Sequence, residues 1–139
     1  MVCDNLEIRK ITVIGSGTMG AGIAQVCCES GFETILFDKY PESIKNGIAK
    51  INAFWDKGIS KGKTTTEQKE IWSSFLNTSD KLISAVSDAD LVIEAVPEII
   101  DLKIKIFQEL DEFTKPNCIL ATNTSSLSIT KIAKSTKTN

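Results

Sequence analysis

The segment Ile11-Thr12-Val13-Ile14-Gly15-Ser16-Gly17-Thr18-Met19-Gly20 decides the fold. A short apolar, β-branched run stops at a glycine, and the glycine-rich turn leads into a run of helical character. This G-x-G-x-x-G pattern between a strand and a helix is the dinucleotide-binding fingerprint. In it, Gly15 allows the tight turn, Gly17 lets the backbone approach a pyrophosphate, and Gly20 lets the helix pack closely on the strand. Unpaired N–H groups at the helix start then face the phosphates. The predicted cofactor-binding residues of this loop are Gly15, Ser16, Gly17, Thr18, Met19 and Gly20.

A carboxylate supports the same interpretation. Residues 33–37 read as a second strand that ends at Asp38, 18 residues beyond Gly20. This is near the expected distance for the acid that accepts hydrogen bonds from an adenosine ribose. An acid there repels a 2′-phosphate, and the only arginine in the chain is Arg9, so NAD is favoured over NADP as the cofactor. The alternative for Asp38 is a turn residue ahead of Pro41.

Composition excludes several classes of function. At 139 residues the chain is most simply one domain, and its net charge of −2 gives no general basic surface for nucleic acid. No apolar run approaches the roughly 18 residues that span a membrane. The N-terminus has neither the basic start nor the apolar stretch of a signal peptide, and the four cysteines lack metal-ligand spacing. We therefore expect a cytoplasmic protein with free thiols. The absence of histidine excludes a Ser/His/Asp or Cys/His system and a histidine-based metal site, and we expect no metal.

The rest of the chain alternates between strand and helix patterns. Isoleucines and aromatics at steps of three and four between residues 44 and 55 indicate a helix. A polar turn at 58–66 and a second helix over 66–76 complete a helical hairpin at about 41–77. Further segments read as a strand at 78–82, a short connection at 83–86, a strand at 91–96, a helix from Pro97-Glu98, a strand at 118–122 and a helix at 128–134.

This order predicts an α/β fold, a doubly wound parallel sheet (Rossmann) with an inserted helical hairpin. In the helix that begins at Pro97-Glu98, Ile99 is expected on the apolar face and Lys103 on the polar face. Ligands in such folds bind beyond the C-terminal ends of the strands. The segments expected at that edge are 15–20, Asp38, 95–98 and 123–126.

Three stretches carry a resemblance to a known family. They are Val-Ile-Gly-Ser-Gly-Thr-Met-Gly-Ala-Gly-Ile-Ala-Gln at 13–25, Ala-Asp-Leu-Val-Ile-Glu-Ala-Val-Pro-Glu at 89–98, and Leu-Ala-Thr-Asn-Thr-Ser-Ser-Leu-Ser-Ile-Thr at 120–130. The chain resembles the 3-hydroxyacyl-CoA dehydrogenase family, which includes 3-hydroxybutyryl-CoA dehydrogenases. The third stretch is the most diagnostic, because few other dehydrogenases share its Asn-Thr-Ser-Ser-Leu string. The resemblance covers nearly the whole chain but only the N-terminal, NAD-binding domain of the family.

The resemblance implies an oxidoreductase of fatty acid metabolism (β-oxidation), which passes hydride from the 3-hydroxyl of an (S)-3-hydroxyacyl-CoA to NAD, or runs the reverse reduction. Its substrate is then an acyl-CoA of the 3-hydroxybutyryl-CoA kind. Carried over by position, Asp38 holds the adenosine ribose, and Glu98 and Lys103 lie near the nicotinamide half of the cofactor. Ser125 lies between nicotinamide and substrate, which makes it the catalytic candidate, and Lys57 contacts the CoA phosphates. Lys103 and Ser125 also count as substrate-binding candidates.

Each of these residues also has a plainer interpretation. Glu98 could be an acid stabilised by the dipole at a helix N-terminus, and Ser125 a capping or turn residue. Lys103 could lie on a solvated helix face, and Lys57 could be a loop charge.

The chain departs from the family pattern at its end. Family members continue into a Gly-x-His-Phe-Phe-Asn-Pro stretch, whose histidine is the catalytic base, and then into a helical domain that forms the homodimer. This chain ends at Asn139, before that stretch. We therefore expect residues 1–139 to be an NAD-binding domain that is inactive on its own, without the C-terminal helical domain. The alternatives are a stand-alone, non-catalytic NAD-binding module and another β-hydroxyacid dehydrogenase; the Asn-Thr-Ser-Ser-Leu string argues against the latter.

Overall fold

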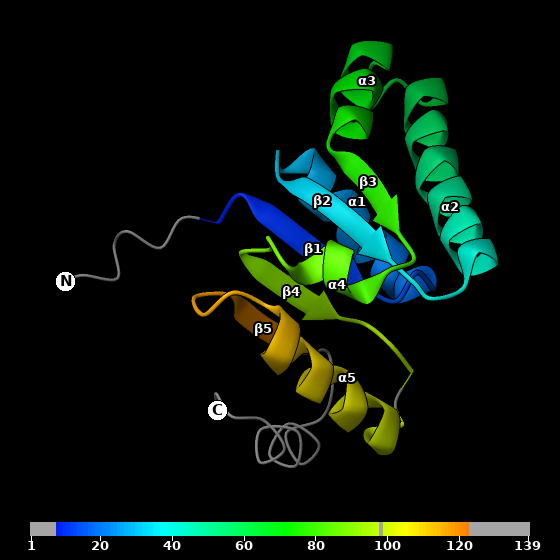
Figure 1. Ribbon diagram of the computed structural model, residues 1–139. Coiled ribbons are helices and arrows are strands. Elements are labelled where there is room, and N and C mark those ends of the chain that lie inside the picture. The colour runs from blue at the N-terminus through cyan, green and yellow to red at the C-terminus, as the bar shows by residue number, and fades with distance from the viewer. Residues whose placement is uncertain (1–7, 98, 123–139) are drawn as a thin grey trace.

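The computed structural model describes residues 8–97 and 99–122, which form a parallel sheet between layers of helices (Figure 1). The five strands are β1 (Lys10–Ile14), β2 (Glu33–Phe37), β3 (Leu76–Ser79), β4 (Leu91–Glu94) and β5 (Ile119–Thr122). The five helices of the described residues are α1 (Thr18–Glu29), α2 (Pro41–Ser60), α3 (Thr66–Ser74), α4 (Leu82–Val86) and α5 (Ile100–Phe113).

The strand order is β3-β2-β1-β4-β5, with every neighbouring pair parallel. The chain winds outward from β1 through β2 to β3, then crosses back to β4 on the other side of β1. Val13 accordingly pairs with Leu36 on one side and with Ile93 on the other. The winding direction reverses between β1 and β4, and ligands of open α/β sheets bind at such a switch point. The predicted doubly wound parallel sheet is confirmed.

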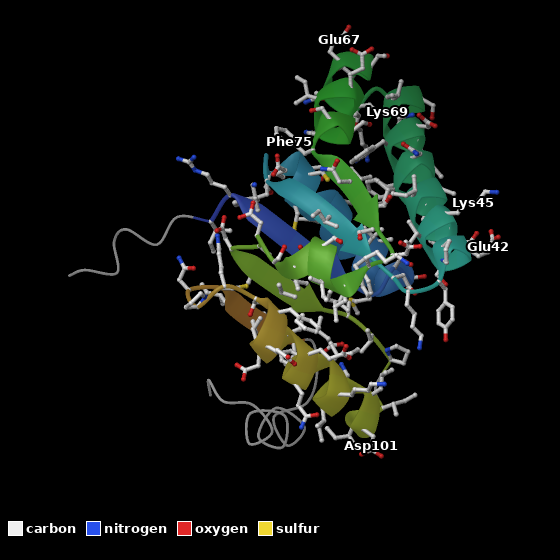
Figure 2. The ribbon with its side chains drawn as sticks, in the orientation of Figure 1. Glu42, Lys45, Glu67, Lys69, Phe75 and Asp101 are labelled. Atoms are coloured by element: carbon white, nitrogen blue, oxygen red, sulfur yellow. The ribbon has the colours of Figure 1, made fainter. Side chains whose placement is uncertain are left out.

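Two helices, α2 and α3, connect β2 to β3. The polar turn expected at 58–66 is shorter than predicted, because α2 continues through Ser60. A capping box starts α3: Gln68 N–H donates to Thr65 Oγ1 over 3.0 Å, and Thr65 N–H donates to Gln68 Oε1 over 2.9 Å. The two helices meet through Trp55 and Trp72, whose ring centroids lie 5.7 Å apart. The outer side of α2 carries charged side chains, including Lys45 (Figure 2).

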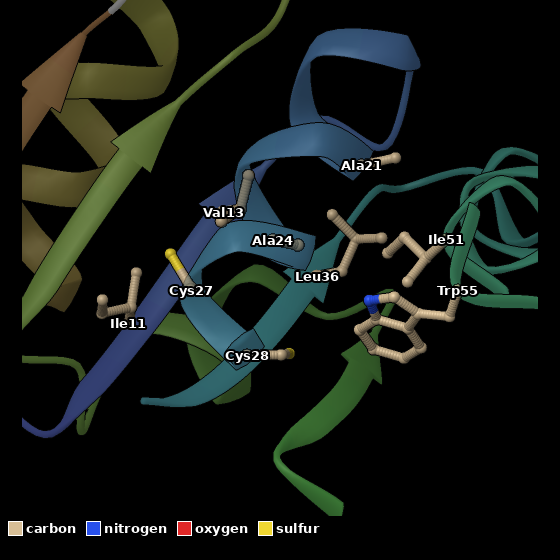
Figure 3. Close-up of a cluster of buried hydrophobic side chains, with 9 residues drawn as sticks. All are labelled: Ile11, Val13, Ala21, Ala24, Cys27, Cys28, Leu36, Ile51 and Trp55. Atoms are coloured by element: carbon tan, nitrogen blue, oxygen red, sulfur yellow. The ribbon is translucent and has the colours of Figure 1, made fainter. Parts of the chain in front are cut away.

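One core lies between the sheet and the helices α1 and α2 (Figure 3). The apolar steps predicted along α2 place Ile51 and Trp55 in this core, whereas Phe54 is exposed. The Trp55 indole is anchored by a 2.8 Å hydrogen bond from Nε1 to Glu29 Oε2 at the end of α1. The buried residues of this core are Ile11, Val13, Ala21, Ala24, Cys27, Cys28, Leu36, Ile51 and Trp55.

A second core packs α4 and α5 against the sheet. Its buried residues are Ile14, Phe37, Ala85, Val86, Ala89, Val92, Phe107 and Leu110. Ile14 belongs to this core while its neighbour Val13 belongs to the first, as the alternation of side chains along a strand requires. Helices therefore cover both faces of the sheet, as predicted.

Several predicted boundaries are wrong. β3 lies at Leu76–Ser79 rather than 78–82, and 82–86 is the short helix α4 rather than a connection. Helix α5 starts at Ile100, and Ile99, expected on its apolar face, is the exposed N-cap. The helix predicted at 128–134 falls outside the described residues.

Candidate functional site

The loop after β1 and the first turn of α1 each require a glycine. Gly15 has φ of 103°, and a Cβ there would lie 2.8 Å from the Ala95 carbonyl oxygen beyond β4. A Cβ on Gly20 would lie 1.7 Å from the Gly15 carbonyl oxygen. Gly15 thus permits the turn beside β4, and Gly20 lets α1 pack against the loop. Both roles match the fingerprint.

Gly17 has no such structural requirement. Its φ is −67°, and no atom lies within 4 Å of a Cβ built on it. It is the N-cap of α1, which has neither a side-chain cap nor an acidic residue in its first turn. The loop therefore leaves open space and uncapped N–H groups where the fingerprint places a diphosphate, so this part of the site fits a dinucleotide.

Asp38 lies against the same loop. Its Oδ2 accepts hydrogen bonds from Ser16 N–H over 3.1 Å and from Ser16 Oγ over 3.0 Å, and its Oδ1 accepts from Tyr40 N–H over 3.0 Å. Because Ser16 is buried, these bonds fix the carboxylate beside the start of α1. The acid and the glycine loop, predicted separately from the sequence, are therefore neighbours.

A crevice of about 1160 Å³ joins them at the C-terminal edge of the sheet. Of the predicted loop residues, Gly20 alone does not line this crevice, because it faces the loop backbone. Ala95, Val96 and Pro97, which follow β4, form another wall. The predicted residues that line the crevice are Gly15, Ser16, Gly17, Thr18, Met19 and Asp38.

The α2 side of the crevice carries residues that the sequence analysis did not identify. Ser43, Asn46 and Lys50 line it, and Lys50 Nζ donates a 2.8 Å hydrogen bond to Thr18 Oγ1. The buried Gly47 packs against the Ser16 backbone and brings this face of α2 to the loop. The sequence signal was a lysine three residues after a glycine, on one face of the helix.

The prediction that Lys103 lies on the polar face of its helix is wrong. Its side chain is 1% exposed, and its Nζ lies 2.9 Å from Oε1 and 2.8 Å from Oε2 of Glu94. Glu94 is fully buried and also accepts hydrogen bonds from Val96 N–H, over 2.6 Å, and from Thr122 Oγ1. A lysine is buried only when its charge has a partner, and Glu94 supplies it. Lys103 does not line the crevice.

The remaining predicted site residues are not gathered here. Lys57 is exposed on α2 and does not line the crevice. Glu98 and Ser125 lie outside the described residues.

Three further findings concern metal ligands, thiols and membrane spans in the part of the chain that the structure describes. No three Asp, Glu, Cys or His residues there could hold a metal ion. Cys27 and Cys28 are free and buried, and burial raises the pKa of Cys28 to about 11, which disfavours its thiolate. Among these helices none has the length and hydropathy of a membrane span.

Comparison with known proteins agrees with this geometry. The family described as "3-hydroxyacyl-CoA dehydrogenase, NAD binding domain" matches residues 10–139. A 3-hydroxybutyryl-CoA dehydrogenase of Bradyrhizobium diazoefficiens is 42% identical over 129 residues, 93% of this chain and 44% of that protein. The 3-hydroxyadipyl-CoA dehydrogenase of Escherichia coli is 40% identical over 95% of this chain and 28% of its own length. The chain thus spans less than half of these relatives.

Solved structures show the same likeness. The (S)-3-hydroxybutyryl-CoA dehydrogenase of Ralstonia eutropha superimposes with a TM-score of 0.89 at 37% identity, over 94% of this chain and 46% of that one. A lactate dehydrogenase of Cryptosporidium parvum, at 18% identity and a TM-score of 0.67, shares the fold alone.

Proposed function

The chain belongs to the 3-hydroxyacyl-CoA dehydrogenase family as its NAD-binding domain, and from this premise we propose that it holds NAD for oxidation of the 3-hydroxyl of an (S)-3-hydroxyacyl-CoA, or for the reverse reduction. The observation that carries the proposal is the single crevice that joins the glycine loop to Asp38. The names of the relatives support a substrate of the 3-hydroxybutyryl-CoA kind.

The glycine loop and Asp38 each have a part in cofactor binding. The uncapped N–H groups of Thr18 and Met19, with the dipole of α1 behind them, hold the diphosphate. Asp38 accepts hydrogen bonds from the adenosine ribose, and Ser16 keeps its carboxylate in place. A 2′-phosphate at this position would meet a fixed negative charge, so NAD is preferred over NADP.

When bound, NAD supplies the hydride acceptor, and the chain positions it against the substrate. Glu98 and Lys103 lie near the nicotinamide half, Lys103 acting through its buried contact with Glu94. Ser125 orients the reacting oxygen of the substrate, and Lys57 contacts the CoA phosphates. Support for the Ser125 assignment comes from the pairing of Thr122 with Glu94, because it makes β5 end at the same edge of the sheet as β4, three residues before Ser125 in the sequence.

Residues 1–139 on their own bind NADH without turning over 3-hydroxyacyl-CoA. The reason is that they contain no histidine, whereas proton transfer from a 3-hydroxyl at neutral pH calls for a general base of that kind.

Calorimetric titration of the 139-residue chain with NADH and NADPH, beside its Asp38→Ala variant, tests this proposal. The chain should bind NADH more tightly than NADPH. The variant should lose about 10- to 100-fold in NADH affinity, the value of a charged hydrogen-bonding group, and much of the discrimination. An NADH/NADPH ratio unchanged by the substitution would contradict the role of Asp38. Steady turnover of 3-hydroxybutyryl-CoA by the wild-type chain would contradict its inactivity.

A further inference from the structure

Lys50 places a positive charge at the mouth of the glycine loop. Its Nζ lies 2.8 Å from Oγ1 of Thr18, the first residue of α1. Both residues line the crevice, so the ammonium stands at the edge of the space beside the helix start. None of the ion pairs in the described part of the chain includes Lys50. Its charge is therefore available to a ligand.

The packing of α2 holds Lys50 in this place. Gly47, one helical turn earlier, is buried against Ser16, and a Cβ there would lie 2.7 Å from the Ser16 carbonyl oxygen. Only glycine lets α2 come this close to the loop. Residues three apart share a helix face, so the contact at Gly47 directs the exposed side chain of Lys50 toward the loop.

The position is electrostatically costly without an anion. A helix N-terminus already carries partial positive charge, and a cation beside it is unfavourable. The first turn of α1 has no acidic residue to offset that charge. Asp38, the acid that lies against the loop, is already bonded to Ser16 and Tyr40. A diphosphate at the loop would relieve the repulsion between Lys50 and α1.

We propose that Lys50 is a direct ligand of the cofactor diphosphate, donating from the α2 side while the α1 N–H groups donate from the other. This assignment rests on the proposed function, since it requires NAD in the crevice. It adds a side-chain cation to a fingerprint that otherwise relies on backbone groups and the helix dipole. Thr18 keeps the ammonium in position through its Oγ1.

The test compares Lys50→Met with Lys45→Met in the 139-residue chain. Lys45 lies on the same helix, on its outer side (Figure 2), and does not line the crevice. NADH and NADPH are titrated at several salt concentrations. Lys50→Met should weaken NADH about three- to tenfold, as expected for one charge-assisted contact at a partly exposed site, and should reduce the salt dependence of binding. It should weaken NADPH by the same factor, whereas Lys45→Met and Lys50→Arg should stay within about twofold of wild type.

Each other outcome overturns the assignment in a recognisable way. If Lys50→Met binds NADH with wild-type affinity while Asp38→Ala binds it more weakly, Lys50 does not contact the cofactor, and the proposed function is unaffected. If Lys50→Met loses affinity for NADPH but not for NADH, Lys50 contacts the 2′-phosphate and not the diphosphate. If Lys45→Met loses as much NADH affinity as Lys50→Met, the effect comes from the net charge of the chain and not from a contact at Lys50. If wild-type chain binds no NADH, both proposals fail.

Discussion

Lys103 and Glu94 form a fully buried ion pair, with Nζ 2.8 Å from Oε2. Glu94 ends β4, and Lys103 belongs to α5. Because the same carboxylate accepts the Val96 N–H and the Thr122 hydroxyl, one buried group links the ends of two strands to a helix. Val96 lines the crevice, so this network fixes part of the wall of the site.

Replacing Lys103 by Met should destabilise the fold by about 3–5 kcal/mol, because it leaves the Glu94 carboxylate buried and without its counter-charge. Urea denaturation of the chain measures the loss. The surface pair Lys69–Asp56, 2.6 Å apart, provides the control: Lys69→Met should cost about 1 kcal/mol or less. Equal costs for the two lysines would show that burial adds nothing to the Lys103 pair.

Gly17 and Gly20 should respond differently to alanine. Gly17→Ala meets no protein atom and should change the free energy of unfolding by no more than about 1 kcal/mol, the scale of an N-cap change. It should nevertheless weaken NADH at least about tenfold, because its methyl group occupies the space of the diphosphate. Gly20→Ala should lower the melting temperature, since its Cβ collides with the Gly15 carbonyl. Unchanged NADH affinity in Gly17→Ala would place the ligand elsewhere.

Gly47→Ala tests the contact between α2 and the loop. Alanine in a helix interior gains about 0.5–1 kcal/mol over glycine. At Gly47 the backbone oxygen of Ser16 stands 2.7 Å from the new methyl group, so we expect overpacking to prevail and the variant to lose about 1–3 kcal/mol. Gly22→Ala, in α1 with nothing within 4 Å, is the matched control and should be neutral or stabilising. Thermal melts of both variants measure these effects. A higher melting temperature in Gly47→Ala would mean that α2 and the loop after β1 are not in close contact.

Asp90 should make stability depend on acid pH. Its carboxylate accepts from Lys115 Nζ, Arg9 N–H and Lys10 N–H, and these bonds, that from Lys115 first, lower the Asp90 pKa to about 2 from its ordinary 3.8. The stabilisation is present above about pH 4 and is lost as the pH falls toward 2, because protonation breaks the bonds. Urea midpoints measured down this range should fall less steeply in Asp90→Asn and in Lys115→Met than in wild type. If the urea midpoints of the variants and of wild type fall equally steeply with pH, Asp90 does not contribute to the acid dependence of stability.

The sequence was sufficient for the features that local rules govern. The run from Ile11 to Gly20 contains its own strand, turn and helix start, so the site at the end of β1 could be placed from it. The boundaries of β3 and α4 could not be predicted from the sequence, because β3 is a four-residue edge strand with little apolar alternation and α4 spans only five residues. Neither segment is long enough to show a period.

The contacts that the sequence missed are distant along the chain. Lys103 looks like a surface lysine until β4 brings Glu94 beneath it. Lys50 meets Thr18 across 32 positions, and only the close packing at Gly47 makes that contact possible. Periodicity assigns a face to a residue but does not identify the element that covers the face, so tertiary contacts of this kind stay hidden.

The most direct test of NAD binding in the crevice is to follow the backbone amide resonances of the isotope-labelled chain while NADH is added. We predict that the largest shifts fall on Gly15, Gly17, Thr18 and Met19, with a second group at Asp38 and Tyr40, and that resonances of the outer face of α2 around Lys45 stay in place. Saturable shifts that spare both the glycine loop and Asp38 would contradict the account.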